Sequence, residues 1–387
     1  MKIKEIRAVR LNLPRSPGSA TRPRRSSWAE GAEVANPVSK FPAYKRHRSS
    51  WMPKWETVYV KATAEDGTWG LGQTSFGRAT AAVVEDHFGP MLAGESCFAI
   101  EKIWDMMFRM SKPYGSSGIA ACAMSGVDLA LWDLVGRLKG QPVYELLGGP
   151  VRDTIFAYAT GNDVDWYREL GFRAFKLACP YGPADGLRGL DENERFVAAA
   201  REQVGDDAEL MLDCYMAFDV EYTIRLAERL RPYRLRWIEE FLIPEDIEGH
   251  RAVREAVTWT ALASGEHLYT PWPFRQMIER RCLDILQPDI HWVGGLTACV
   301  KIAHMAEAAG LTVMLHGGGS AYGLHFTAAM PNTPWAEYYI GSAPGVPLEE
   351  ARRFPGTTFP KDSMIRPNDG PGFGVEVKEE WLTPFFS

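Results

Sequence analysis

The sequence predicts an α/β protein, namely a (β/α)8-type (modified TIM) barrel that carries an α+β capping domain. Between residues 154 and 340, short β-rich runs alternate with amphipathic helical stretches such as DENERFVAAAREQVG. Eight such alternations in one region are typical of a (β/α)8 barrel. Charged or histidine side chains also stand at the ends of most runs, where a barrel places its chemistry. An open doubly wound sheet is the alternative, but that fold would more often show a glycine-rich phosphate loop after its first strand.

The region before the barrel, residues 1–145, is predicted to form the capping domain. Its start, MKIKEIRAVRLNL, alternates apolar and charged side chains like a strand and lacks the apolar core of a signal peptide. The run TVYVKATAEDGTWGLG (57–72) places Asp-Gly between two β-rich stretches, which predicts a hairpin. The run AACAMSGVDLALWDLVGRLKG (120–140) has helical spacing and stops just before Pro142.

Two segments of less regular pattern complete the predicted organisation. Residues 15–50 are rich in Arg, Ser, Pro and Gly, and long loops of this kind in compact proteins are often functional lids. We therefore expect this loop to cover a substrate. The barrel is expected over residues 146–345, and the segment 346–387 is expected to pack back onto the cap.

Composition and charge narrow the class of function. The net charge of −6 gives no general attraction to nucleic acid or to an anionic membrane. No apolar run reaches the roughly 18 residues of a membrane span. The six cysteines stand singly, without the short spacings of a zinc site, which favours free thiols in a reducing compartment. We expect a cytoplasmic enzyme.

The strongest signal is a row of reactive side chains at the predicted strand ends. From Asp213 onward, successive members lie about one β/α unit apart, and scattered charges would not keep step with such a repeat. In a barrel, side chains at these ends gather at one mouth. The members of the row are Lys176, Asp213, Glu239, Glu266, Asp289, His316 and Glu337.

Asp213, Glu239 and Glu266 follow three successive strands and predict a metal site. Three neighbouring inward carboxylates repel one another unless a cation holds them. Oxygen-only ligation without cysteine suits a hard ion such as Mg²⁺. The alternative is that each carboxylate is a helix cap or a loop charge, an interpretation that weakens when three of them keep register.

His316 and Asp289 stand on the next two strand ends and predict a general base. A carboxylate beside an imidazole fixes its tautomer and raises its basicity. The alternative is that His316, which precedes three glycines, is an incidental turn residue. Glu337 and His267 are further candidates for proton delivery or for contacts with substrate hydroxyls.

The run LRWIEEF (235–241) ends in two adjacent glutamates whose directions should differ. Neighbouring side chains on a strand point to opposite faces, so Glu239 shares a face with Trp237, and Glu240 shares one with Ile238. Parity alone leaves open which face lines the barrel interior.

The motifs assembled so far resemble the enolase superfamily, and within it the mandelate racemase subgroup and its rhamnonate-type acid-sugar dehydratases. The resemblance spans nearly the whole chain from residue 37. Its motifs are VDLALWDLVGRLKGQPVYELLGGPVRD, YATG, LMLDCYM, RWIEE, SGEH, QPDIHWVGGLT, HGG, NTPWAE and PGFGVEV.

The resemblance implies Mg²⁺-dependent dehydration of a sugar acid to a 2-keto-3-deoxy acid. It implies Asp213, Glu239 and Glu266 as the Mg²⁺ ligands, which would settle Glu239 as the inward glutamate of the pair. It also implies catalytic and substrate-binding roles at the neighbouring strand ends. These are His316 as the base, Asp289 as the residue that orients it, Glu337 as a donor to the enediolate, and His267 beside the substrate hydroxyls.

Two departures from the family pattern bear on the substrate. Members with two-faced chemistry carry Lys-x-Lys on the second barrel strand, whereas this chain has Lys176 and Ala178. That difference argues against racemisation, and Lys176 is then expected to help bind the substrate carboxylate. The segment NPVSKFPAYKRHR (36–48) matches the family's lid and implies Arg48 as a substrate-binding residue. An expected lid histidine is absent, and SSWAEGAEV (26–34) stands in its place, which leaves the particular sugar acid open.

Three rival interpretations remain at this point. An epimerase, racemase or other isomerase on the same scaffold is disfavoured by Ala178. A non-catalytic barrel is disfavoured by the intact carboxylate set, and a metal-dependent hydrolase by the absence of an HxH pair on the first strand. The expected partners are a small-molecule sugar acid and further copies of the chain, with no nucleic acid and no membrane.

Overall fold

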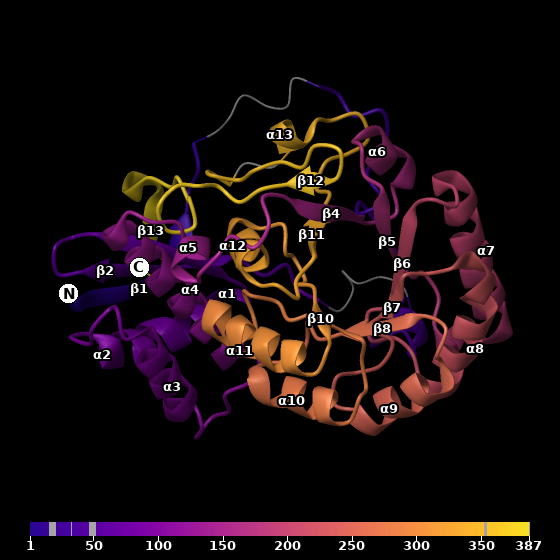
Figure 1. Ribbon diagram of the computed structural model, residues 1–387, viewed down its shortest axis with the longest axis horizontal. Helices are drawn as coiled ribbons and strands as arrows, with labels where there is room; N and C mark the ends of the chain where they lie inside the picture. The colour runs from indigo at the N-terminus through magenta and orange to yellow at the C-terminus, as the bar shows by residue number, and fades with distance from the viewer. Residues whose placement is uncertain (15–20, 32, 46–51, 352–353, 387) are drawn as a thin grey trace.

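The cap is built on an antiparallel sheet that joins both ends of the sequence. A computed structural model describes residues 1–14, 21–31, 33–45, 52–351 and 354–386. Four strands pair in the order β13-β1-β2-β3, and Figure 1 shows this sheet beside the barrel. Their bounds are β1 Ile3–Leu11, β2 Val58–Ala64, β3 Trp69–Thr74 and β13 Leu382–Pro384. Gly67, at φ 88°, makes the tight turn of the predicted β2–β3 hairpin.

Helices cover the face of this sheet that turns toward the barrel. The longest, α4 (Ile119–Lys139), ends at Gly140, whose φ of 66° is the left-handed conformation favoured at helix ends. Its most apolar stretch is long enough to cross a membrane, but 89% of that stretch is buried inside the protein, as in a core helix. The other helices of the cap are α1 Gly77–Val83, a π-helical turn Val84–Phe88, α2 Gly89–Leu92, α3 Ile100–Met110 and α5 Val143–Leu146.

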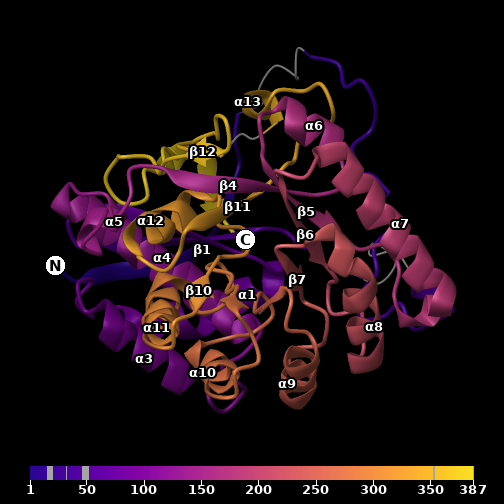
Figure 2. The same cartoon turned by 45° about the vertical axis from the view of Figure 1, so that its right-hand side comes forward.

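The barrel is a curled parallel sheet with helices outside it (Figure 2). In the described part of the chain, eight strands pair in the order β10-β9-β8-β7-β6-β5-β4-β11. The strands are β4 Ile155–Thr160, β5 Ala174–Ala178, β6 Glu209–Asp213, β7 Trp237–Glu239, β8 Ala261–Ser264, β9 Ile285–Leu286, β10 Thr312–Val313 and β11 Trp335–Tyr339. This arrangement confirms the predicted fold class.

Each barrel strand is followed by a helix or by a short connection on the outer side. Three of these helices begin at side-chain caps, because Asp219, Asp246 and Ser320 accept hydrogen bonds from the backbone of the first turn. The helices are α6 Val164–Glu169, α7 Gly186–Val204, α8 Val220–Leu230, α9 Ile247–Ala256, α10 Pro271–Glu279, α11 Gly295–Ala308 and α12 Ala321–Ala329.

The barrel interior is layered by strand parity. A floor of apolar side chains fills the centre, and Trp237 stacks edge-on against Tyr158 there. Two residues further along most of these strands, the inward position carries a polar side chain instead. Residues that alternate along a strand share a face, so the polar layer lies directly above the apolar one. The floor-and-mouth pairs are Tyr158 with Thr160, Ala174 with Lys176, Met211 with Asp213, Trp237 with Glu239 and Trp335 with Glu337.

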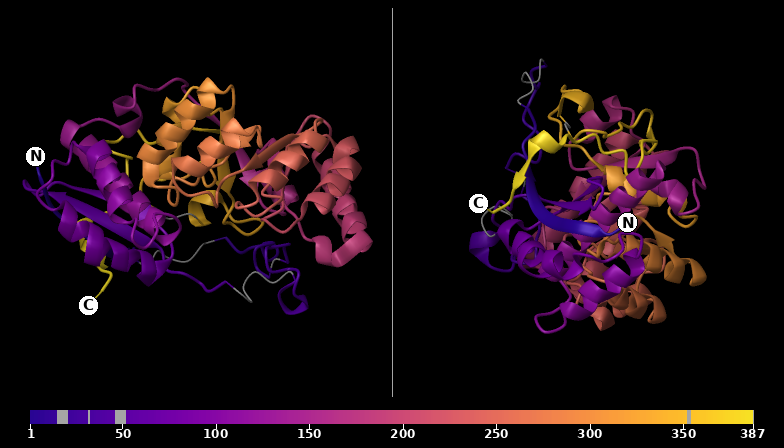
Figure 3. Two further views of the ribbon diagram at one scale, coloured as in Figure 1. Left: turned by 90° about the horizontal axis from the view of Figure 1, so that it is seen from below. Right: turned by 90° about the vertical axis from the view of Figure 1, so that its left-hand side faces the viewer.

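The two irregular segments both touch the barrel. The C-terminal segment adds β12 (Met364–Ile365) antiparallel to β4, and then returns to the cap through β13. The described parts of the N-terminal loop run below the barrel in the left view of Figure 3. Ala35 N donates to Cys179 O at 2.9 Å, which ties this loop to the end of β5.

Candidate active site

Three carboxylates converge at the mouth of the barrel. Asp213 ends β6, Glu239 ends β7, and Glu266 stands two residues beyond β8. One carboxylate oxygen from each lies within 4.8 Å of the others. The parallel register sets Asp213 directly opposite Glu239, so the strand pairing itself forces these two charges together.

The crowded carboxylates carry perturbed protonation equilibria. Burial raises the pKa of Asp213 to about 6 and that of Glu239 to about 7, although the Lys176 ammonium opposes both shifts. Buried carboxylates of like charge destabilise one another, and a bound divalent cation would neutralise them. Three oxygen donors at this spacing, without cysteine, fit Mg²⁺, so the residues present suit the ion that the sequence predicts.

Lys176 bridges the carboxylates from within the barrel. It is 1% exposed, and its Nζ makes a short contact with Glu239 Oε1. The same atom lies 2.8 Å from Glu337 Oε1 and 3.8 Å from Asp213 Oδ2. Sequence reasoning expected this lysine at a substrate carboxylate. The structure places it among the protein's own carboxylates.

Glu239 is held by neighbours on both sides. Trp237 Nε1 and Gln287 Nε2 each donate to Glu239 Oε2 at 2.8 Å. These two bonds fix the orientation of the Glu239 carboxylate. Sequence reasoning missed Gln287, although its place in the motif QPD, just after β9, was a usable signal.

His316 and Asp289 form a bonded pair. Their backbones make an isolated parallel bridge, and His316 Nδ1 lies 2.6 Å from Asp289 Oδ2. The other ring nitrogen, His316 Nε2, lies 3.5 Å from Oε2 of Glu266, one of the three converging carboxylates. Burial lowers the pKa of His316, but the negative field of Glu266, Asp289 and Glu337 outweighs burial and raises it well above the ordinary value.

Glu337 accepts three hydrogen bonds at the end of β11. Thr160 Oγ1 donates to Oε1 at 2.5 Å, Lys176 Nζ lies 2.8 Å from the same oxygen, and Gly317 N donates to Oε2 at 2.8 Å. Burial alone would raise the pKa of Glu337, yet Lys176 and His316 lower it to about 2. Glu337 is therefore a fixed anion in this state. Thr160 was not expected from the sequence.

His267 pairs with Glu240, the second glutamate of LRWIEEF. His267 Nδ1 lies 2.8 Å from Glu240 Oε2. The parity rule would send Glu240 away from the interior, but its φ of 48° is left-handed and turns the side chain back into the site. Burial lowers the pKa of His267, and the carboxylates of Glu240 and Glu266 outweigh it and raise the pKa to about 9.

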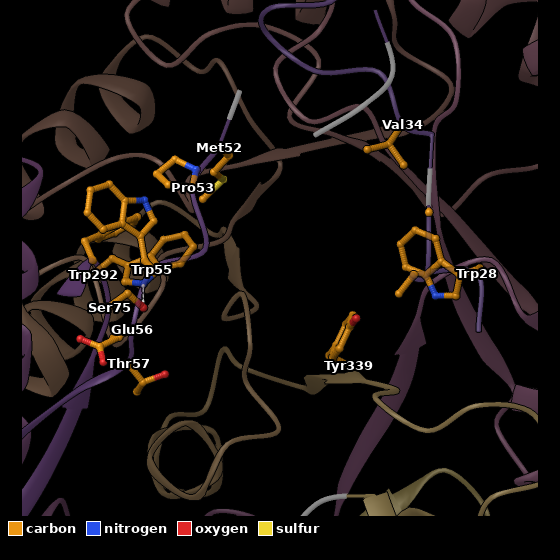
Figure 4. Close-up of a pocket in the computed structure, with 13 residues that line it drawn as sticks. Trp28, Val34, Met52, Pro53, Trp55, Glu56, Thr57, Ser75, Trp292 and Tyr339 are labelled. Atoms are coloured by element: carbon orange, nitrogen blue, oxygen red, sulfur yellow. Dashed lines mark hydrogen bonds between the residues drawn. The ribbon is translucent and has the colours of Figure 1, made fainter. Parts of the chain in front are cut away.

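An aromatic pocket adjoins the carboxylates and histidines. It encloses about 550 Å³. Figure 4 shows Trp55, Trp292 and Met52 on one side of it, with Trp28 and Tyr339 on the other. The Trp292 ring connects the pocket to the site, since its centroid is 5.2 Å from that of His316 and 5.8 Å from that of His267.

The N-terminal loop reaches this pocket from a fixed anchor. Asp163, after β4, is 3% exposed and accepts hydrogen bonds from Trp28 N at 2.9 Å, from Ser27 Oγ at 3.2 Å and from Arg25. Arg25 also lies 2.6 Å from Asp165. The predicted substrate-binding residue Arg48 lies outside the described residues.

Comparison with known proteins places the chain in a family. Residues 46–148 match the family model "Mandelate racemase / muconate lactonizing enzyme, N-terminal domain". Residues 161–381 match "Enolase C-terminal domain-like". The chain therefore belongs to the mandelate racemase/muconate lactonizing enzyme family of the enolase superfamily, which confirms the resemblance seen in its motifs.

Individual relatives share a narrower description. The chain is 41% identical to a Caldivirga maquilingensis protein provisionally named an L-rhamnonate dehydratase, over 99% of this chain and 97% of that protein. It is 39% identical to the L-rhamnonate dehydratase of Saccharopolyspora erythraea, over 98% and 97%. Its structure is similar to that of rhamnonate dehydratase from Gibberella zeae complexed with Mg, with a TM-score of 0.91, 34% identity, and coverage of 99% and 96%.

Proposed function

We propose that this protein is a Mg²⁺-dependent sugar-acid dehydratase that acts on an aldonate of the L-rhamnonate type. The observation that carries the proposal is the meeting of three carboxylates with the His316–Asp289 pair at one barrel mouth. The rhamnonate dehydratases to which the chain is similar along nearly its whole length support the same reaction. The reaction class is a hydro-lyase.

Asp213, Glu239 and Glu266 would hold the Mg²⁺ ion. When bound, the ion supplies Lewis acidity toward the substrate carboxylate and offsets the negative field around His316. A weaker negative field around His316 favours its neutral imidazole, which is the form that can accept a proton. Asp289, bonded to Nδ1, leaves Nε2 as the accepting atom.

The proposed chemistry is an elimination of water. His316 Nε2 removes the proton from C2, and the electron pair of that C–H bond becomes delocalised into the substrate carboxylate. The C3–O bond then breaks, and the hydroxyl leaves as water with a proton from an acid, for which protonated His316 serves in a syn elimination. The resulting enol tautomerises to the 2-keto-3-deoxy acid.

The other residues at the mouth complete the proposed site. Glu337, held by Thr160 and Lys176, would lie beside the enediolate and would donate a hydrogen bond to it once it has taken up a proton. His267 would lie beside the substrate hydroxyls. Lys176 lies among Asp213, Glu239 and Glu337, and its positive charge would favour binding of the substrate carboxylate beside them. Arg48 would bind the substrate from the lid.

Isomerisation on the same scaffold is the rival that the geometry disfavours. The relatives include a 3,6-anhydro-D-galactonate cycloisomerase from Zobellia galactanivorans, 27% identical with a TM-score of 0.77. Epimerisation or racemisation needs a second base opposite His316. The position where the family pattern would supply it is Ala178, which is paired in register with Asp213.

A substrate screen tests the proposal directly. Aldonic and aldaric acids are incubated with the protein and Mg²⁺, and the 2-keto-3-deoxy product is measured. His316→Asn should lower kcat by roughly 10²- to 10⁴-fold, the range of general acid–base catalysis, whereas the exposed His304→Gln should not. No turnover of any acid, full activity of His316→Asn, or C2 hydrogen exchange without loss of water would each overturn the proposal.

The setting of the enzyme is part of the same proposal. All six cysteines are buried free thiols, which suits a reducing cytoplasm. The proposed partners are the sugar acid and further copies of the chain in a homo-oligomer, with neither nucleic acid nor membrane. Sedimentation of the purified protein measures the assembly.

A further inference from the structure

Glu240 is a buried carboxylate for which the proposed reaction has no use. It is 1% exposed and lies beside Glu239, yet it belongs neither to the Asp213–Glu239–Glu266 set nor to the His316–Asp289 pair. Buried carboxylates are rare unless they are bonded or functional. Glu240 therefore calls for an account of its own.

Its partner is the ring of His267. His267 Nδ1 lies 2.8 Å from Glu240 Oε2, as His316 Nδ1 lies 2.6 Å from Asp289 Oδ2. The two rings flank Glu266, with His267 Nδ1 3.5 Å from one of its oxygens and His316 Nε2 3.5 Å from the other. The mouth of the barrel thus holds two carboxylate–histidine pairs, one on each side of Glu266.

We propose that Glu240 is a positioning residue that fixes the His267 ring so that Nε2 meets the substrate hydroxyls. The inference rests on the proposed dehydratase function and names a residue through which that function works. With Nδ1 held by Glu240, Nε2 is the nitrogen left for a ligand. The side chain of His267 is 18% exposed, so the ring retains an open edge at the mouth.

The backbone around Glu240 is built to aim this carboxylate. Its φ of 48° is a left-handed conformation that a residue with a Cβ adopts at a cost, and such strain gathers at functional sites. Hydrogen bonds brace it on both sides. Glu240 N donates to Ala263 O at 3.0 Å, and Met216 N donates to Glu240 O at 2.5 Å.

Aromatic rings complete the seat of His267. Tyr215 lies edge-on with its centroid 5.7 Å away, and Trp292 lies at 5.8 Å. These contacts restrict where the ring can sit but do not distinguish its two nitrogens. The bond to Glu240, at 2.8 Å the shorter of the two carboxylate contacts of Nδ1, makes that distinction, because a carboxylate accepts a hydrogen bond from one chosen N–H.

A metal role for Glu240 is the competing explanation. Glu240, Glu266 and His267 also lie close enough together to hold an ion. That group includes an imidazole nitrogen, however, whereas Mg²⁺ prefers oxygen ligands and the neighbouring three-carboxylate set supplies them. His267 Nδ1 is also already bonded to Glu240 Oε2, so the two side chains satisfy each other without an ion.

A double-mutant cycle separates these explanations. Glu240→Leu removes the acceptor and should lower kcat/KM by about 10- to 100-fold, the usual effect of losing a residue that orients a ligand. Glu240→Gln keeps an oxygen acceptor and should recover most of that loss. In a His267→Gln background, Glu240→Leu should cause no further loss. The matched control is Glu255→Gln on α9, an exposed glutamate of the same β/α unit.

Mg²⁺ titration of the same variants provides the second readout. Positioning predicts Mg²⁺ affinity within about threefold of wild type for Glu240→Gln and Glu240→Leu. Additive losses in the double mutant, or a loss of Mg²⁺ binding that accounts for the lost activity, would overturn the inference.

A readout without turnover keeps the inference distinct from the proposed function. The bonded Nδ1 proton of His267 should give a downfield imidazole resonance in wild type and in Glu240→Gln. The resonance should be absent from His267→Gln and from Glu240→Leu. An inactive wild type that shows this pattern would refute only the proposed reaction. An active wild type whose resonance survives Glu240→Leu would refute the role of Glu240.

Discussion

Lys176 shows how a single buried cation sets the charge of the whole mouth. Its ammonium lies among Glu239, Glu337 and Asp213, and its neighbours' charges raise its pKa well above the ordinary value although burial opposes them. A buried charge of this kind is stable only while its partners stay ionised. Lys176 and a bound divalent cation therefore share the work of neutralising the same carboxylates.

Replacing Lys176 with methionine should destabilise the protein by about 3–5 kcal/mol, because it leaves buried carboxylates without their partner. The loss should be largest in EDTA and smaller in excess Mg²⁺, since the ion supplies the missing positive charge. Urea unfolding under the two conditions measures both values. Lys102→Met, whose side chain is 59% exposed, serves as the control, and equal losses with and without Mg²⁺ would contradict the shared role.

At the scale of elements, the cap depends on a contact between β3 and α4 that admits no side chain. A Cβ on Gly72 would lie 2.0 Å from Gly126 O and 2.7 Å from Ala130 N, and both of these atoms are backbone. Gly70 meets Leu134 N in the same way, at 2.2 Å. The glycines allow sheet and helix to approach more closely than ordinary side chains would permit.

Gly72→Ala should therefore lower the free energy of unfolding by at least about 1–3 kcal/mol, the usual cost of overpacking a core. The comparison variant is Gly341→Ala, where an added Cβ would lie 3.9 Å from the ring carbon Cε1 of Tyr339, which is ordinary van der Waals contact. That change should stay within about 0.5 kcal/mol. Chemical denaturation measures the free energy of unfolding of both variants. Similar losses for the two would refute the close contact between β3 and α4 as the cause.

The N-terminal loop is a second element whose behaviour follows from one anchor, Asp163. Asp163→Ala removes the acceptor for Trp28 N, Ser27 Oγ and Arg25, so this part of the loop should detach more often. We expect faster tryptic cleavage after Arg24 and Arg25, and a KM raised by about tenfold. Charged hydrogen bonds are each worth roughly 1.5–3 kcal/mol, enough for such a shift.

Glu169→Gln is the matched control for the N-terminal loop, because Glu169 pairs with Arg24 at 2.7 Å but is half exposed. It should change cleavage and KM little. Unchanged proteolysis in Asp163→Ala would show that the loop is held by other contacts.

The elements also show what a sequence can reveal about such a site. The repeat of strand ends predicts the barrel and brings Asp213, Glu239, Glu266, Asp289 and His316 to one mouth, because parallel strands end on one side of a sheet. Parity does not predict Glu240, because a left-handed residue breaks the alternation. Trp28 in the N-terminal loop has no spacing signal, since its position depends on a contact between distant segments. Thr160 ends β4 at an inward position, but its uncharged hydroxyl does not stand out in the sequence, and its bond to Glu337 joins residues 177 positions apart.

At the scale of the whole molecule, cap and barrel meet where α4 touches the start of α11. Asp128 of α4 accepts a hydrogen bond from Thr297 N of α11 at 3.0 Å. Burial raises the pKa of Asp128 to about 7, although Thr297 and Lys301 oppose the shift. The joint between the two parts of the molecule thus contains a carboxyl group that resists ionisation.

The pH dependence of this joint has a definite sign. Because the folded-state pKa of Asp128 lies above the ordinary 3.8, the native state holds its proton more tightly than the unfolded chain. Its contribution to stability is complete below pH 3.8 and is lost as the pH rises toward about 7. The total change for this group is up to about 4 kcal/mol.

Asp128→Asn should remove that part of the pH dependence. The difference in the free energy of unfolding between Asp128→Asn and wild type should move in favour of the variant as the pH rises from 4 to 8. Thermal unfolding across this range measures it. A constant difference would show that Asp128 ionises normally in the folded protein.

The pairing of β13 with β1 has a consequence for synthesis on the ribosome. Asn12 Nδ2 and Thr383 Oγ1 are hydrogen-bonded across a separation of 371 residues. At a typical rate of 5–20 residues per second, that edge of β1 waits roughly 20 to 70 seconds for its partner strand. An exposed strand edge is a template for pairing with other chains. Until β13 emerges, the nascent protein therefore exposes this edge of β1 to pairing with other chains, and a chaperone that shields the edge would act during that interval.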